Sequence, residues 1–268
     1  MTTFYGTSEP DKITGSSLAD IVFAYGGNDE VRGEAGDDLI HGHEGNDLLY
    51  GGADFDKIYG GVGNDTIYGG LDGDELYGGD GNDIIHVGGG RGTVGIDIAY
   101  GGAGDDILDV GPGWYGSGDI DPLQIFHGGS GNDQISGGRG SDHLYGGNHN
   151  DTFNGGQDGD ELTGGAGADV LNGGAGADQF FFAVADSGTA SSGQADVIND
   201  LEAEDQIWLQ GSYTFAGSVM NPGENQYSVW FDSKEGAWTL RWNAANDPGF
   251  HDVIVHGENP VGDISFFV

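Results

Sequence analysis

A nine-residue repeat constrains the fold of this chain more than any other feature. From residue 6 to residue 86, nine units follow one another without interruption, as in GGVGNDTIY at 60–68 and GGDGNDIIH at 78–86. Residues 87–91 form an insertion, and ten further units fill 92–181. In seventeen of these units position 6 is Asp and position 8 is apolar, whereas the two units across 110–127 are degenerate. A fixed period of this kind indicates a solenoid whose coils stack on one another.

Composition narrows the class of partner. Seven Lys and Arg residues against 45 Asp and Glu residues give a formal net charge of −38. This charge argues against nucleic acid or an anionic membrane surface and favours cations as partners. The chain has no cysteine, so neither disulfides nor thiolate metal sites can form. It has no apolar run long enough to span a membrane, and its first residues do not form an N-terminal secretory signal.

The repeat resembles the RTX (repeats-in-toxin) nonapeptide, G-G-x-G-x-D-x-U-x with U apolar, over about two thirds of the chain. The resemblance implies an all-β fold, a right-handed parallel β-helix or β-roll with calcium-binding turns. The residues agree with it, because x-U-x forms a short strand with U pointing inward. The glycines of the turn permit positive φ and leave carbonyl groups bare. A hard cation requires oxygen ligands, which carbonyl groups and Asp carboxylates supply.

The resemblance also implies where calcium binds. Two units make one coil of 18 residues, so Asp47 is expected above Asp29 and Asp65 above Asp47. Each ion would be held by two position-6 Asp residues and by alternating turn carbonyls, with about ten or more ions in all. The expected ligand residues are Gly27, Asp29, Gly36, Asp38, Gly45, Asp47, Gly52, Asp56, Gly61, Gly63, Asp65, Gly70, Asp74, Gly79, Gly81, Asp83, Gly95, Asp97, Gly102, Gly104, Asp106, Gly129, Gly131, Asp133, Gly138, Gly140, Asp142, Gly147, Asp151, Gly156, Asp160, Gly165, Gly167, Asp169, Gly174, Gly176 and Asp178.

Some turns depart from the pattern without losing it. Asp54 and His149 replace glycine at position 4, but Asp and His tolerate positive φ, so those sites are expected to persist. The first two units carry Glu9 and Leu18 at position 4 and have no Gly-Gly pair. They are expected to form coils that bind calcium weakly, because their turns lack the glycines that expose carbonyl groups.

The degenerate stretch 110–127 predicts an interruption. Tyr115 and Gln124 stand at the ligand position of its two units, so we expect a gap in both calcium rows. Pro112, Trp114 and Pro122 are expected in a surface bulge.

Three segments are predicted: an N-terminal leader at 1–5, the β-roll at 6–181, and a cap with a secretion signal at 182–268. A solenoid needs such a cap because its last coil would otherwise expose unpaired backbone groups. The stretch DVINDL at 196–201, followed by DQIWL at 205–209, is similar to the module that closes RTX solenoids in serralysin-type proteases and alginate epimerase R-modules. Leu201 stands where that family has Phe, and Glu204 where it usually has Gly.

Alternating apolar residues at 227–231, 238–242 and 253–255 favour half-buried antiparallel strands in the cap. Its tryptophans are expected in the core of the cap rather than on a sugar-binding surface: Trp208, Trp230, Trp238 and Trp242. The last residues, GDISFFV at 262–268, are similar to the uncleaved type I secretion signal of RTX proteins. An ordinary last strand is the other interpretation of this segment.

Position 9 predicts a further surface feature. With two units per coil, its side chains form two ladders, one with Tyr50, Tyr68 and His86, the other with His41, Tyr59 and Tyr77. Stacked rings stabilise a sheet by cross-strand pairing, which is one interpretation. The alternative is a contact face for a glycan or for a second copy of the chain.

The sequence contains neither H-E-x-x-H nor G-x-S-x-G, so we expect no enzymatic activity. Two functional hypotheses follow. In the first, which Met1 and the immediate onset of the repeats favour, the chain is a secreted, extracellular calcium-binding protein with a structural, adhesion or matrix-interaction role. In the second, it is the RTX and secretion domain of a larger exported enzyme such as a protease, lipase or alginate epimerase. Both hypotheses imply calcium ions and the type I secretion machinery as partners, with no nucleic acid and no transmembrane segment.

Overall fold

The fold was analysed in a computed structural model, which describes residues 1–89, 95–111, 123–183, 195–210, 214–215, 226–232, 237–243, 251–257 and 264–267. Every regular element in these ranges is a β-strand. Within the same ranges, no helix is long and apolar enough to cross a membrane. The chain divides into two compact units, Met1–His143 and Leu144–Val268.

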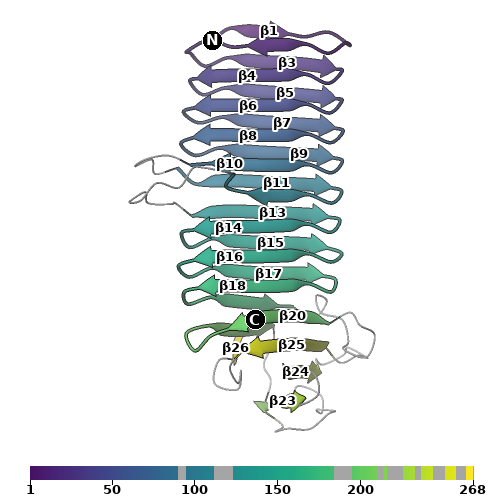
Figure 1. Cartoon of the computed structure of the whole chain (residues 1–268), viewed down its shortest axis with the longest axis vertical. Coiled ribbons are helices and arrows are strands. Elements are labelled where there is room, and N and C mark those ends of the chain that lie inside the picture. The colour runs from purple at the N-terminus through teal and green to yellow at the C-terminus, as the bar shows by residue number, and fades with distance from the viewer. Residues whose placement is uncertain are drawn as a thin grey trace. The chain divides into compact units, whose positions relative to one another are not determined.

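The first unit consists of two parallel sheets that the chain visits alternately (Figure 1). Odd-numbered strands form one sheet, called sheet A here: β1 (Thr3–Tyr5), β3 (Ile21–Gly26), β5 (Leu39–Glu44), β7 (Lys57–Val62), β9 (Glu75–Asp80), β11 (Asp97–Ala103) and β13 (Gln124–Ser130). Even-numbered strands form sheet B: β2 (Lys12–Thr14), β4 (Glu30–Ala35), β6 (Leu48–Ala53), β8 (Thr66–Leu71), β10 (Ile84–Gly88), β12 (Ile107–Asp109) and β14 (Gln134–Arg139). This arrangement confirms the predicted β-roll.

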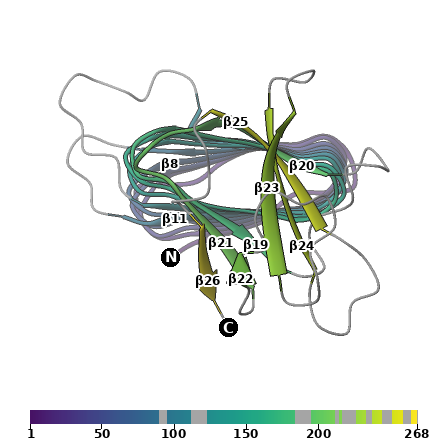
Figure 2. The same cartoon turned by 90° about the horizontal axis from the view of Figure 1, so that it is seen from below.

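The two sheets face each other across a flat apolar core, with β8 and β11 on opposite sides when the coils are viewed end on (Figure 2). Position 8 supplies this core, and Ile58, Ile67 and Leu76 are fully buried. Positions 7 and 9 flank it on the strand and therefore point outward, since side chains alternate along a strand. Register follows the repeat, because Leu49 lies beside Ile67 and Ile58 beside Leu76.

The interruption at 110–127 is smaller than the sequence predicts. β12 pairs with β14, and β11 pairs with β13 in a register that places Asp97 beside Gln124. Residues 124–127 therefore lie in the roll as part of β13, where Phe126 is fully buried at position 8. The prediction of a gap in both rows is wrong for the row before sheet B, where Asp133 directly follows Asp106. In the row before sheet A, Gln124 stands in place of Asp, as expected.

The second unit continues the same alternation and then departs from it. One sheet contains β15 (His143–Asn148), β17 (Glu161–Ala166), β19 (Gln179–Phe182), β21 (Gln206–Gln210) and β26 (Ile264–Phe267). The other contains β16 (Thr152–Gln157), β18 (Val170–Ala175), β20 (Asp196–Leu201), β25 (His251–Gly257), β24 (Ala237–Asn243), β23 (Gln226–Asp232) and β22 (Thr214–Phe215). Strands β20 and β21 pair in parallel with β18 and β19, so the roll extends one coil beyond residue 181.

The predicted antiparallel strands are present. β23 pairs antiparallel with β24, and β24 with β25. Trp242 is fully buried, as expected for the core, whereas Trp208 and Trp238 are half-buried. The side chain of Trp230 lies outside the described residues, as do Pro112, Trp114, Tyr115 and Pro122. Residues 264–267 form β26 parallel to β21, which agrees with the interpretation of this segment as a last strand.

Candidate metal centre

The position-6 aspartates form two columns along the first unit, one at the turn before each sheet. In the column before sheet B, the backbone N–H of each Asp donates to Oδ1 of the Asp one coil further on. These bonds join Asp29 to Asp47, Asp47 to Asp65 and Asp65 to Asp83, each at 2.8 Å. The predicted stacking is therefore confirmed. The column passes both insertions, because Asp83 donates to Asp106 and Asp106 to Asp133, also at 2.8 Å.

The second column precedes sheet A and follows the same rule. Asp20 donates to Asp38 at 2.7 Å, Asp38 to Asp56 at 2.9 Å and Asp56 to Asp74 at 2.8 Å. Past the insertion, the N–H of Gln124 donates to Oδ1 of Asp142 at 2.7 Å. Gln124 thus holds its place in the column without supplying a carboxylate.

The same columns occur in the second unit and reach beyond the last predicted repeat. Asp169 donates to Oδ1 of Asp196 at 2.9 Å, and Asp178 donates to Asp205 at 3.0 Å. Asp196 and Asp205 were absent from the expected ligands because the predicted repeats end at residue 181. The available signal was the spacing of Asp196 from Ile198 and of Asp205 from Ile207, which equals the spacing of positions 6 and 8.

The second carboxylate oxygen of these aspartates is the unusual atom. Oδ2 is buried and accepts no hydrogen bond in nine aspartates of the described part of the chain: Asp29, Asp38, Asp47, Asp56, Asp65, Asp74, Asp83, Asp106 and Asp178. A buried carboxylate oxygen without a donor is costly unless a cation neutralises it. Repetition of this cost from coil to coil points to a cation ligand that recurs with the repeat.

Burial also opposes ionisation of these groups. It is the largest influence on each, and it raises the pKa of Asp65 to about 7, of Asp56 to about 8 and of Asp74 to about 9. A backbone N–H that donates to Oδ1 partly lowers the pKa again, whereas the negative charge of neighbouring aspartates raises it further. A divalent cation at Oδ2 would favour the charged form and remove this penalty.

Turn glycines bring backbone carbonyl groups into the same region. Of the glycines expected to bind calcium, all but Gly95 and Gly167 have positive φ. A Cβ on Gly63 would overlap the carbonyl oxygen of Gly45, one coil earlier, so the carbonyl points at this glycine. Asp54 and His149 have φ values of 75° and 80°, which confirms that non-glycine residues keep the turn there.

Backbone oxygens must supply most of the ligands. Nowhere in the described ranges do three His, Asp or Glu side chains meet at one point in a metal-binding cluster. One Asp per turn together with bare carbonyl groups is the donor set that a hard cation such as Ca²⁺ accepts. The residues present therefore fit calcium.

Position-1 glycines were not expected to matter for the site, but they make room for it. A Cβ on Gly60 would overlap Oδ2 of Asp65 in the same unit, and a Cβ on Gly42 would overlap Oδ2 of Asp47. The glycine therefore allows the carboxylate to fold back over its own turn. The signal was the preference for Gly at position 1, which resembles an ordinary turn preference until the Asp is placed.

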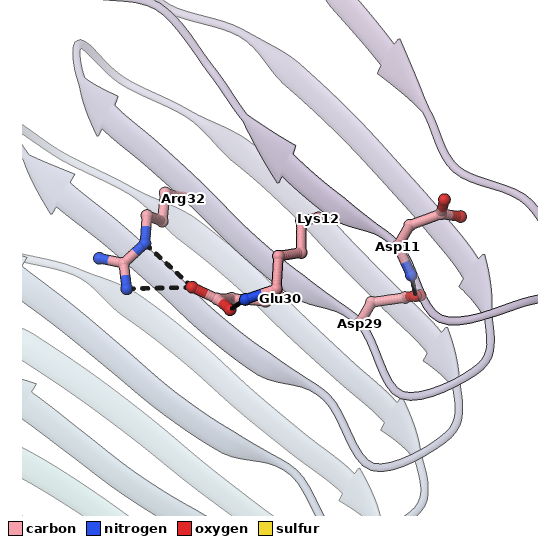
Figure 3. Close-up of polar contacts among 5 residues, drawn as sticks. All are labelled: Asp11, Lys12, Asp29, Glu30 and Arg32. Carbon is pink, nitrogen blue, oxygen red and sulfur yellow. Dashed lines mark hydrogen bonds and ion pairs between the residues drawn. The ribbon is translucent and has the colours of Figure 1, made fainter.

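The first two turns satisfy their aspartates with protein donors. Oδ2 of Asp11 accepts the N–H and the hydroxyl of Thr7, at 2.6 and 2.9 Å. Oδ2 of Asp20 accepts the N–H and the hydroxyl of Ser16, at 2.8 and 2.7 Å. Asp11 still joins its column, because its N–H donates to Asp29 (Figure 3). These coils form as predicted, and their Oδ2 atoms do not require a cation.

Comparison with known proteins agrees with this geometry. Residues 5–40, 14–49, 23–58, 41–76, 59–94, 91–113, 127–162 and 154–183 match the family model of the RTX calcium-binding nonapeptide repeat (4 copies), and together they make up more than half of the chain. No curated protein matches the chain. One similar solved structure is the solution structure of the AlgE6R2 subunit from the Azotobacter vinelandii mannuronan C5-epimerase, with 28% identity over 63% of this chain and 91% of that one and a TM-score of 0.34. By the match to the repeat model, the chain belongs to the RTX calcium-binding nonapeptide repeat family.

Proposed function

We propose that this protein is exported unfolded, folds on calcium outside the cell, and then acts through its surface as a structural or adhesion module rather than as an enzyme. The observation that carries the proposal is the repeated buried Oδ2 without a donor, as in Asp47, Asp65 and Asp83. Where no site exists in the unfolded chain, the free energy of metal binding becomes free energy of folding. A net charge of −38 opposes compaction until cations bind.

Calcium titration of the metal-free chain tests the folding step. Circular dichroism should change from coil to β-sheet as calcium is added, and a chelator should reverse the change. Magnesium is the matched control, because it prefers a rigid octahedral shell and retains its waters, so it should fold the chain poorly. A chelated sample that keeps its full β signal contradicts the proposal.

Export is tested separately through the last residues. We expect a chain lacking 263–268 to remain in the producing cell, because this segment supplies the type I secretion signal. The deletion also removes β26, the partner of β21, so the purified variant must be checked for calcium-induced β structure. Fusion of residues 195–268 to a small passenger protein is the complementary test, since it adds the signal without removing a strand. Export of the truncated chain at the level of the full one would show that the signal lies elsewhere.

A further inference from the structure

The outer face of sheet B carries an open groove in the first unit. Its volume is about 260 Å³, and strands β4, β6 and β8 line it with Arg32, Glu34, Tyr50, Tyr68 and the glycine pairs that follow each tyrosine. The register places Arg32 beside Tyr50, and Tyr50 beside Tyr68. The groove therefore runs across successive coils.

The aromatic side of the groove is a stack of side chains. The rings of Tyr50 and Tyr68 are stacked with their centroids 4.9 Å apart and an interplanar angle of 8°. The guanidinium carbon of Arg32 lies 4.3 Å from the centroid of Tyr50, which continues the stack at one end. Since the ring faces cover one another, a ligand meets the ring edges and the hydroxyl groups.

The floor of the groove is bare backbone. Glu34 lies beside Gly52 on the next strand of sheet B, and Gly52 lies beside Gly70 on the one after. At this position, therefore, β4 carries a side chain and β6 and β8 carry none. Glycine at such a position allows a ligand to approach the sheet closely. The strands below are already paired on both sides within the sheet, so an added peptide strand cannot be recognised through their backbone.

Sheet A has the same ladder, but its tyrosines are engaged by neighbouring side chains. Tyr77 donates its hydroxyl to Glu75, and Lys57 binds Glu75 at 2.8 Å while lying 5.5 and 5.3 Å from the rings of Tyr59 and Tyr77. The corresponding neighbours on sheet B are Leu48 and Thr66, which are too short to reach a tyrosine hydroxyl. Within the described residues, the hydroxyls of Tyr50 and Tyr68 have no hydrogen-bond partner.

Charge at the groove is balanced, unlike that of the chain as a whole. Glu30 pairs with both Lys12 and Arg32 beside the groove, so the cation at its end is already neutralised (Figure 3). An anionic polymer would therefore meet little attraction here and repulsion from the rest of the surface. A neutral ligand rich in hydroxyl groups, with apolar C–H surfaces, matches two free phenol hydroxyls over a glycine floor.

We propose that this groove binds a neutral polysaccharide, with its chain running across β4, β6 and β8. The proposal deepens the proposed function, on which it rests, by naming the class of surface that the calcium-folded protein contacts. A polymer fits better than a small molecule because the groove is open and continues from coil to coil. Tyr50 and Tyr68 supply hydrogen bonds to sugar hydroxyls, and the glycines permit contact with the sugar ring.

Binding of hexasaccharides to the full chain in saturating calcium tests the groove. The probes are cellohexaose and mannohexaose as neutral sugars and hexagalacturonate as a charged one, measured by isothermal titration calorimetry. Tyr50→Asn and Tyr68→Asn are the variants, because Asn154 and Asn172 occupy the same position in a paired coil of this protein. Tyr59→Asn on sheet A is the matched control.

We expect a neutral hexasaccharide to bind, each sheet B variant to lower its affinity by about tenfold, and the control to bind like the unaltered protein. If the calcium-folded chain binds no neutral sugar, or if Tyr59→Asn loses as much affinity as the sheet B variants, the proposed polysaccharide site is wrong. Either result would leave the proposal of calcium-induced folding intact. Preference for hexagalacturonate would also overturn the proposed polysaccharide site. So would a dimer in sedimentation that Tyr50→Asn dissociates, since a second copy would then occupy the groove. A chain that stays unfolded in calcium would refute the proposed function and the groove together.

Discussion

The backbone N–H of Asp47 donates to Oδ1 of Asp65 at 2.8 Å, while Oδ2 of the same Asp65 carboxylate is buried and accepts no hydrogen bond. One oxygen therefore positions the side chain against the preceding coil, and the other remains for a cation. Because Asp65 repeats the arrangement with Asp83, each carboxylate links two coils and each cation site depends on its neighbours.

Asp65→Asn should weaken calcium binding without breaking the column. Asn keeps the acceptor for the N–H of Asp47 but replaces the charged Oδ2 with an amide. We expect fewer bound ions and a loss of about 1–3 kcal/mol of stability in saturating calcium. Asp80→Asn is the control, because it removes the same charge from an exposed position outside both aspartate columns. Calorimetry and thermal unfolding measure both, and equal effects would contradict the assignment of Oδ2 as a ligand.

Thr7→Val and Ser16→Ala should destabilise the first coils without changing the number of bound ions. Each removes a hydroxyl donor from a position-6 Asp, at a cost of about 1 kcal/mol. Amide hydrogen exchange in β2 and β3 should become faster in saturating calcium, while Ser17→Ala at an exposed site should leave it unchanged. A lower calcium stoichiometry in either variant would show that these turns bind cations after all.

Gly60→Ala should displace the carboxylate of Asp65, because the new Cβ overlaps its Oδ2 and the carbonyl of Gly78. The expected cost is about 1–3 kcal/mol, together with weaker calcium binding. Ala24 occupies the same position in another unit, so the coil itself should survive. Gly26→Ala is the matched control, since its Cβ would make only ordinary contacts, the nearest at 3.7 Å. Calcium affinity unchanged in Gly60→Ala would refute a role for position 1.

Glu75→Gln should lower the pKa of Tyr77. The hydrogen bond to Glu75 is the main cause that raises the pKa of this phenol to about 12, because ionisation would place a phenolate beside a carboxylate. With a neutral amide in that place, the phenol should titrate at lower pH, nearer its ordinary value of about 10. NMR titration of the Tyr77 ring measures the change, and Glu30→Gln on sheet B should not alter it. An unshifted Tyr77 in Glu75→Gln would mean that burial, not Glu75, sets its pKa.

Much of the fold could be predicted because the residues within each nine-residue unit determine its turn and its buried face. Gly at positions 2 and 4 selects positive φ, and an apolar residue at position 8 selects the buried face, whatever lies above or below. The period then places Asp47 over Asp29, and Tyr50 beside Tyr68, as the structure confirms. Asp54 and His149 could be placed in turns for the same reason, since a backbone preference belongs to the residue itself.

Other features depend on which coils meet, and only the tertiary structure decided them. The stretch 110–127 looks degenerate throughout in sequence, yet Gln124 and Phe126 lie in β13 and pair with β11. Among the residues that the structure describes, the hydroxyl of Tyr50 is free, whereas that of Tyr77 donates to Glu75. The difference comes from the residues that flank each ladder, which are Leu48 and Thr66 on sheet B but Lys57 and Glu75 on sheet A. A repeat encodes the backbone path of every coil, whereas contacts between side chains of different units exist only after the coils have stacked.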